Sequence, residues 1–344
     1  VEQAESGVAE GIGVRVRVGG AWGFAATRET TRAGGEEALA RALAVARAQP
    51  AAPATARAPA PPATGHWAAP CDIDPFSVSL DDKLGLLHAA EAALGTDPRL
   101  ASRQATYVGG RTRKALATSE GVAVTQEFVE CGASVVATAV GSGEVQTRSY
   151  PLGHSGDVAG RGWEHILGLD LAAHAPRVGE EAIALLTAPA CPAGRRTIVL
   201  HGEQVALQVH ESIGHALELD RMLLGEASYA GTSWVLPADL GSLVYGSPLL
   251  NITADATLPA GLGSFGWDDE GVAAPQTLKK SSRGGGFDAA DGLRSDVARK
   301  VVSIINLASV RAIENMVGAP VHPLLWTTQL MKNKAQKWLT QRLF

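Results

Sequence analysis

Residues 122–140 read VAVTQEFVECGASVVATAV, a run in which β-branched and small apolar side chains lie on both sides of Gly132. The segments before it, ATYVGG at 105–110 and RKALATSEG at 113–121, are also rich in strand-forming residues and end in glycine. Runs of this kind, bounded by turn residues, are typical of short antiparallel strands. We therefore predict an antiparallel meander over residues 103–149, with its strands separated at the glycines.

A second β pattern lies near the start of the chain, in GIGVRVRVGGAWGFA at 11–25. Valines and arginines alternate over residues 14–18, and Gly19-Gly20 supplies a turn before a second apolar segment. Alternation of this period predicts strands with one buried face, and the glycine pair predicts a hairpin.

An alanine-rich helix is predicted next, beginning at Thr30 or Thr31 and ending near Gln49. Its larger apolar residues are expected on one side: Leu39, Leu43 and Val45. Residues 50–64 hold five prolines and no large apolar residue, so we expect an extended linker or surface loop there.

The remaining patterns mix helix and strand without regular alternation. Ser79 suits the N-cap of a helix that ends at Gly95. The other expected elements are a helix over 157–188 broken near Pro176, a short strand over 197–200, a helix over 204–219 and extended chain over 233–257. Because strands and helices do not alternate as βαβ units, we predict an α+β fold.

Composition limits the class of protein. The 344 residues are 46% hydrophobic with a formal net charge of −5, which argues for folded cores and against an electrostatic nucleic-acid binder. No apolar run reaches the roughly 18 residues that cross a bilayer. The three cysteines are far apart and suggest no disulfide framework. We expect a soluble, cytoplasmic protein with no membrane partner.

Residue usage changes near Lys279. Residues 1–278 carry 19 basic and 31 acidic side chains, whereas residues 279–344 carry 11 and 4, with six of the eight lysines. A functional basic tail is one interpretation. The other, which we favour because residue usage changes along with charge, is unrelated sequence after a truncation or frameshift.

One stretch carries recognisable chemistry, His210-Glu211-Ser212-Ile213-Gly214-His215. Neutral imidazoles bind a divalent ion, and a neighbouring carboxylate takes a proton from water, which is what metal-assisted hydrolysis requires. The alternative is that His210 is a core histidine with its hydrogen bonds satisfied and His215 a surface residue.

The spacing of the two histidines is unusual. Five residues on an ideal α-helix correspond to a rotation of about 140°, which puts the side chains on different faces. Both reach one ion only if the helix has a local i→i+5 bulge or ends between them. We therefore predict a helix that begins near Glu203 and is distorted or ends close to Gly214.

Residues 199–235, VLHGEQVALQVHESIGHALELDRMLLGEASYAGTSWV, resemble the TldD/PmbA family of metallopeptidases, on its TldD side. Further matching segments are GIGVRVRVGGAWGFAAT at 11–27, GRGWE at 160–164 and GSFGWDDEG at 263–271. The resemblance extends in consistent order over about residues 1–278.

This resemblance implies an N-terminal α/β domain with an antiparallel sheet and flanking helices, then a motif helix and a β-rich C-terminal domain. The expected boundaries are 1–189, 190–280 and an atypical tail at 281–344. It also implies a zinc-dependent peptidase that hydrolyses unfolded or small peptides and works as a homodimer or with a TldE/PmbA-like subunit.

Carried over by position, the resemblance makes His210 and His215 metal ligands and Glu211 the general base. The family's third ligand is a cysteine in the C-terminal domain, yet no cysteine follows Cys191 in this sequence. The simplest interpretation is that the natural C-terminal half has been lost and replaced. We therefore expect weak metal binding and poor hydrolysis, and the alternative function is a catalytically silent binding or scaffold subunit.

Three further residues are candidates for the surroundings of the site: Glu218, His201 and Asp269. For His201 the alternative is an ordinary loop histidine, and for Asp269 a solvated turn. Cys191 as a substitute ligand is less favoured than a small structural cysteine.

Overall fold

The computed structural model describes residues 3–50, 61–151, 156–195, 197–200, 202–224, 227–228, 231–239, 242–244, 251–274 and 278–281. The chain divides into two compact units between Pro59 and Ala60, and each is treated by itself. Nearly all of the expected tail at 281–344 lies outside the described residues.

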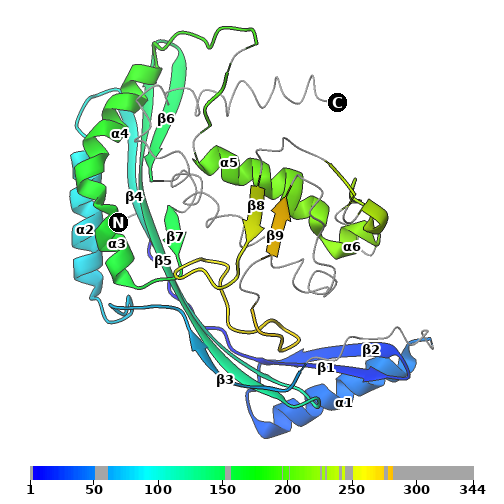
Figure 1. Cartoon of the computed structure of the whole chain (residues 1–344). Helices are drawn as coiled ribbons and strands as arrows, with labels where there is room; N and C mark the ends of the chain where they lie inside the picture. The colour runs from blue at the N-terminus through cyan, green and yellow to red at the C-terminus, as the bar shows by residue number, and fades with distance from the viewer. Residues whose placement is uncertain are drawn as a thin grey trace. The chain divides into compact units, whose positions relative to one another are not determined.

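The first unit is a hairpin and a helix. Strand β1 (Ile12–Val18) pairs antiparallel with β2 (Ala21–Thr27), and helix α1 (Arg32–Ala48) follows (Figure 1). The side chain of Thr31 accepts a hydrogen bond from the Gly34 amide at 3.1 Å and so caps the helix. These observations confirm the predicted hairpin and the start of the helix.

The buried face of α1 differs from the prediction. It is built from residues four apart, Gly34, Ala38, Ala42 and Ala46, whereas the larger Leu39 and Val45 are exposed. A Cβ atom on Gly23 of β2 would lie 1.9 Å from the Ala42 carbonyl oxygen. The helix therefore approaches the hairpin so closely that only small residues fit between them.

The second unit is built on long strands. Strand β5 (Val122–Gly141) pairs antiparallel with β4 (Leu100–Ala117), β6 (Glu144–Tyr150) and β7 (Asp157–Ala159), and parallel with β3 (Ala63–Ala68) (Figure 1). Antiparallel pairing was expected, but two details of the prediction were wrong. Strand β3 lies partly in the presumed linker. Gly121 does lie in the turn between β4 and β5, but Gly109, Gly110 and Gly132 lie within strands.

Gly109 and Gly132 are two of the glycines that lie inside β4 and β5. Gly109 pairs with Cys131, and Gly132 pairs with Val108, so each strand continues through its glycine. A Cβ atom on Gly132 would lie 2.7 Å from the carbonyl oxygen of Asp157 in β7. Glycine at this position therefore permits the close pairing of β7.

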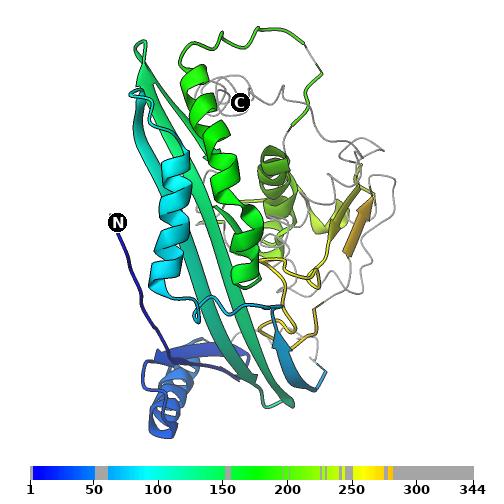
Figure 2. The ribbon, with the colours of Figure 1, turned by 90° about the vertical axis from the view of Figure 1, so that its left-hand side faces the viewer.

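Three helices pack on one face of this sheet: α2 (Leu80–Ala93), α3 (Trp163–Leu169) and α4 (Leu171–Leu185) (Figure 2). Leu94, Val135, Ile166 and Val178 are among the most buried side chains of this core. As predicted, Ser79 caps α2, with its hydroxyl oxygen 3.1 Å from the Asp82 amide.

The helix over residues 157–188 was predicted to break near Pro176, and this was wrong. The break lies at Asp170, whose φ of +46° is left-handed, and Pro176 lies inside α4. Residues 157–159 form β7 instead of helix. Aspartate tolerates the left-handed conformation better than most residues, which explains why the chain turns there.

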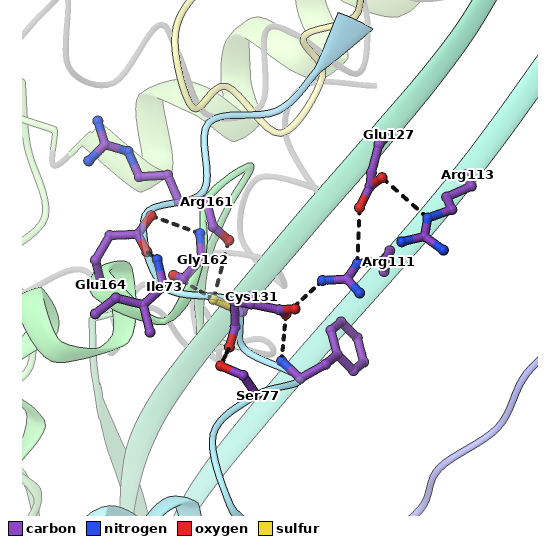
Figure 3. A network of polar contacts seen from close by, with 11 residues as sticks. Ile73, Ser77, Arg111, Arg113, Glu127, Cys131, Arg161, Gly162 and Glu164 are labelled. Atoms are coloured by element: carbon purple, nitrogen blue, oxygen red, sulfur yellow. Dashed lines mark hydrogen bonds and ion pairs between the residues drawn. The ribbon is translucent and has the colours of Figure 1, made fainter. Parts of the chain in front are cut away.

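A polar network fastens the segment before α2 to the sheet (Figure 3). The amides of Ile73 and Gly162 each donate to the Glu164 carboxylate at 2.9 Å. Burial would raise the pKa of Glu164, yet these backbone donors hold it below its usual value. Arg111 of β4 forms ion pairs with Asp74, in the segment before α2, and with Glu127 of β5.

Residues 251–274 and 278–281 add a two-stranded sheet and a loop. Strand β8 (Asn251–Ala254) pairs antiparallel with β9 (Leu278–Ser281). The loop between them is held to β5 by the buried side chain of Gln126, which accepts from the Gly266 and Trp267 amides and donates to the Trp267 carbonyl oxygen.

Two expected strands differ from the structure. Residues 197–200 contain no strand, and Ile198 and Val199 are exposed. Of the expected extended chain over 233–257, the described part holds only β8 and a 3-10 turn, Pro237–Asp239. The architecture is nevertheless mixed helix and antiparallel sheet, which confirms the α+β class. In the described part of the chain, every helix is too short or too polar to span a bilayer.

Candidate metal centre

The motif helix changes its hydrogen-bonding pattern at the first histidine. Helix α5 (Gly202–Val209) is followed by a π-helical turn (His210–Gly214), a 3-10 turn (His215–Leu217) and the short α6 (Leu219–Met222). The helix begins next to Glu203 and is distorted up to Gly214, so both parts of the prediction are confirmed.

The π-turn accommodates one extra residue without interrupting the buried face. Ala206, Val209, Ile213 and Ala216 are all buried, at spacings of three and four residues. Apolar residues at these spacings hold one side of a helix against a core. Glu211 and Ser212 of the same turn are exposed, so the turn presents polar side chains to solvent while its apolar residues stay buried.

The consequence is that the two imidazoles meet. Their ring centroids are 4.4 Å apart, and the rings are nearly perpendicular, at 80°. One ligand atom each from His210, Glu211 and His215 lies within 4.8 Å of the others. Among the described residues, this is the group of histidine, cysteine and carboxylate side chains with the spacing of a metal site.

Hydrogen bonding at the two rings supports a ligand role. Nε2 of His210 lies 3.8 Å from Oε1 of Glu211 and is the ring nitrogen next to this carboxylate, whereas Nδ1 is buried without a hydrogen-bond partner among the described residues. Nδ1 of His215 lies 2.7 Å from Oε1 of Glu218, which leaves its Nε2 for another partner. Imidazole nitrogens with a nearby carboxylate are a donor set that fits Zn²⁺.

Glu218 is itself held from the other side. Glu218 as a whole residue is 9% exposed, and its Oε2 lies 3.0 Å from Nε of Arg221. Arg221 was missed at the sequence level. The available signal was its position three residues after Glu218, since side chains three apart are neighbours on a helix.

The segment after the motif folds back onto it. The hydroxyl of Ser233 donates to the Ala216 carbonyl oxygen at 2.6 Å and accepts from the Val235 amide at 2.9 Å. Ala216, Met222 and Val235 form a small buried cluster. These contacts fix the end of the 3-10 turn and explain the role of Ser233 in the AGTSW sequence.

The other candidate residues have different surroundings. Asp269 forms an ion pair with Lys114 of β4. Cys191 is exposed and does not belong to the His210 group of the described residues. His201 lies outside the described residues.

Comparison with known proteins points to one family. Its models match three consecutive parts of the chain: PmbA/TldA metallopeptidase domain 1 over residues 1–49, the central domain over 73–188 and the C-terminal domain over 193–278.

Comparisons with individual proteins support the same family. Proteins named metalloprotease from Methanothermobacter thermautotrophicus and Synechocystis sp. are each 30% identical, over 278 and 281 residues, covering 81% and 80% of this chain. The chain spans only 57% of the length of either relative. The crystal structure of TldE from Thermococcus kodakarensis shares the fold, with a TM-score of 0.55 at 16% identity over 79% of this chain and 57% of that one.

Proposed function

The chain belongs to the PmbA/TldD metallopeptidase family, and on that premise we propose that it is a zinc-dependent peptidase acting on unfolded or small peptides. The observation that carries the proposal is the π-turn, which brings His210 and His215 together despite their five-residue spacing. A helix that served only to pack its apolar side would have no need of this distortion.

His210 and His215 would hold the ion through ring nitrogens. When bound, a divalent ion supplies Lewis acidity, which makes water easier to deprotonate and polarises a peptide carbonyl. The two rings protrude from one side of the turn, with 20% and 24% of their side-chain surfaces exposed, so an ion can reach them.

Glu211 would be the general base. Its side chain is 62% exposed, and Oε1 lies 3.8 Å from Nε2 of His210. The carboxylate is therefore next to the ligand nitrogens yet open to solvent, and it can accept a proton from attacking water and pass it to the departing amine.

Two histidines are one protein ligand short of a normal catalytic zinc site. The described residues around the motif supply no cysteine, and Glu211 cannot be an inner ligand and remain a free base. We therefore propose weak zinc binding and slow hydrolysis for this chain.

The second candidate function, favoured by the same shortage of ligands, is a catalytically silent binding subunit in a TldD/TldE-like dimer. The domain boundaries at 189–190 and 280–281 and a homodimeric or heterodimeric assembly belong to the same proposal.

Zinc titration of the purified chain by competition with a coloured chelator, followed by cleavage of an unfolded peptide, tests the proposal. We expect measurable binding that His210→Ala and His215→Ala each abolish and that His88→Ala, an exposed control on α2, leaves intact. Zinc binding that survives both motif substitutions would overturn the site. Stoichiometric zinc without chelator-sensitive cleavage would favour the silent subunit.

A further inference from the structure

We propose that Arg221 is a positioning residue of this site, acting through Glu218 on the ring of His215. The inference rests on the proposed function for the identity of the ligand atom, but the arrangement of the three side chains is visible without any ion. His215, Glu218 and Arg221 form a continuous chain of contacts, at 2.7 Å and 3.0 Å.

These three side chains are largely shielded from solvent. The side chains of His215, Glu218 and Arg221 are 24%, 12% and 21% exposed, so water competes little for their polar atoms. A buried carboxylate is costly unless it is paired with a charge or fully hydrogen-bonded. Arg221 provides the opposite charge, and the backbone strengthens the arrangement, since the Arg221 amide donates to the Glu218 carbonyl oxygen at 3.1 Å.

The carboxylate in turn selects one form of the imidazole. An ionised carboxylate can only accept, so the contact with Oε1 of Glu218 places the proton of His215 on Nδ1. The lone pair is then on Nε2, the atom left to bind an ion. A carboxylate behind a histidine ligand fixes both the ring orientation and the tautomer.

Arg221 acts by charge more than by directed hydrogen bonding. Its Nε lies 3.0 Å from Oε2 of Glu218, yet this nitrogen makes no hydrogen bond within the described residues. The contact is therefore an ion pair with poor hydrogen-bond alignment. A lysine at this position should replace it in large part, whereas an uncharged side chain of similar length should not.

His210 has no comparable support among the described residues, because its buried Nδ1 is unpartnered. The two histidines are therefore unequal. His215 has a hydrogen-bond partner on its Nδ1, whereas Nδ1 of His210 has none among the described residues. Loss of Arg221 should consequently weaken the ordered half of the site.

The test compares Arg221→Met, Arg221→Lys and the control Arg103→Met in the whole chain. Arg103 makes a matched Nε contact of 3.0 Å with Glu91, outside the motif. The first readout is zinc affinity by chelator competition. The second, on metal-free protein, is the tautomer of His215 from long-range ¹⁵N–¹H correlation spectra, which a role limited to stability would not change.

We expect Arg221→Met to weaken zinc binding about 10-fold, the lower end of the range for such supporting residues, and to mix the His215 tautomers. Arg221→Lys should stay close to the unsubstituted protein, and Arg103→Met should change neither readout. Unchanged affinity and an unchanged tautomer in Arg221→Met would overturn the inference.

A second pair of variants tests the inference independently, in case Arg221→Met does not fold. If Arg221 acts through Glu218, then Glu218→Gln should weaken zinc binding and Glu218→Gln with Arg221→Met should be no worse. Additive losses would overturn the inference. If the unsubstituted chain binds no zinc, the proposed function fails, and the tautomer measurement still decides whether Arg221 positions His215.

Discussion

The backbone amide of His215 bonds to the carbonyl oxygen of His210, five residues before it. In a regular α-helix this amide would bond to the carbonyl of the residue four before it. The wider turn rotates His215 back toward His210, and the ring centroids come within 4.4 Å. One hydrogen bond of π type thus explains how an unusual spacing produces a compact pair of imidazoles.

Replacing the candidate base should separate metal binding from catalysis. Glu211→Gln keeps the size of the side chain but cannot accept a proton from water, so we expect zinc affinity to be retained and peptide cleavage to fall about 10²–10⁴-fold. Glu180→Gln, an exposed residue of α4, is the matched control and should leave both unchanged. If Glu211→Gln instead weakens zinc binding strongly, Glu211 is a ligand.

Two glycine substitutions should have opposite effects on the first unit. Gly23→Ala puts a Cβ atom 1.9 Å from the Ala42 carbonyl oxygen and 2.6 Å from the Ala46 amide, so we expect a loss of about 1–3 kcal/mol. Gly35→Ala meets only Ile12 Cδ1 at 3.8 Å, and its higher helix propensity should add up to about 1 kcal/mol. Urea denaturation measures both changes, and equal effects would contradict the close approach of α1.

Gln126→Ala should release the loop between β8 and β9. The buried amide group satisfies three backbone groups, at 2.9, 3.0 and 2.9 Å, and each group left unsatisfied costs about 1–3 kcal/mol if it stays buried. We expect faster hydrogen exchange at the Gly266 and Trp267 amides and earlier proteolysis of this loop. Gln104→Ala, exposed on β4, is the control, and protection retained in Gln126→Ala would argue against the anchoring role.

Alkaline pH should destabilise the second unit through Cys131. Burial, with a smaller effect of Glu164, raises the pKa of this thiol from 9.0 to about 12. Above pH 9 the unfolded chain loses the proton while the folded chain keeps it, so stability falls as the pH rises toward about 12. Urea denaturation at about pH 8 and about pH 11 should show a smaller fall for Cys131→Ala than for the unsubstituted protein. An identical fall would place the alkaline sensitivity at other groups, such as Tyr107, whose pKa burial raises to about 12.

Local features of the sequence were sufficient for several elements. The alternation around Val16 and the Gly19-Gly20 turn fix the hairpin, and Thr31 and Ser79 mark the helix starts, because each effect operates over a few neighbouring residues. Local sequence was also sufficient to predict the distorted helix at the motif. Five-residue spacing could satisfy a shared ion only through a distorted helix, and that distortion is present.

Contacts between distant segments were decided only by the tertiary structure. The continuation of β4 and β5 through Gly109 and Gly132, and the burial of alanines in place of Leu39 and Val45 in α1, depend on how closely a neighbour approaches. The sequence by itself determined which residues could form turns, caps and a histidine pair, since these depend on local backbone geometry. Only the fold determined which strands meet and which helix face is buried, because packing distances and burial are set by residues far away along the chain.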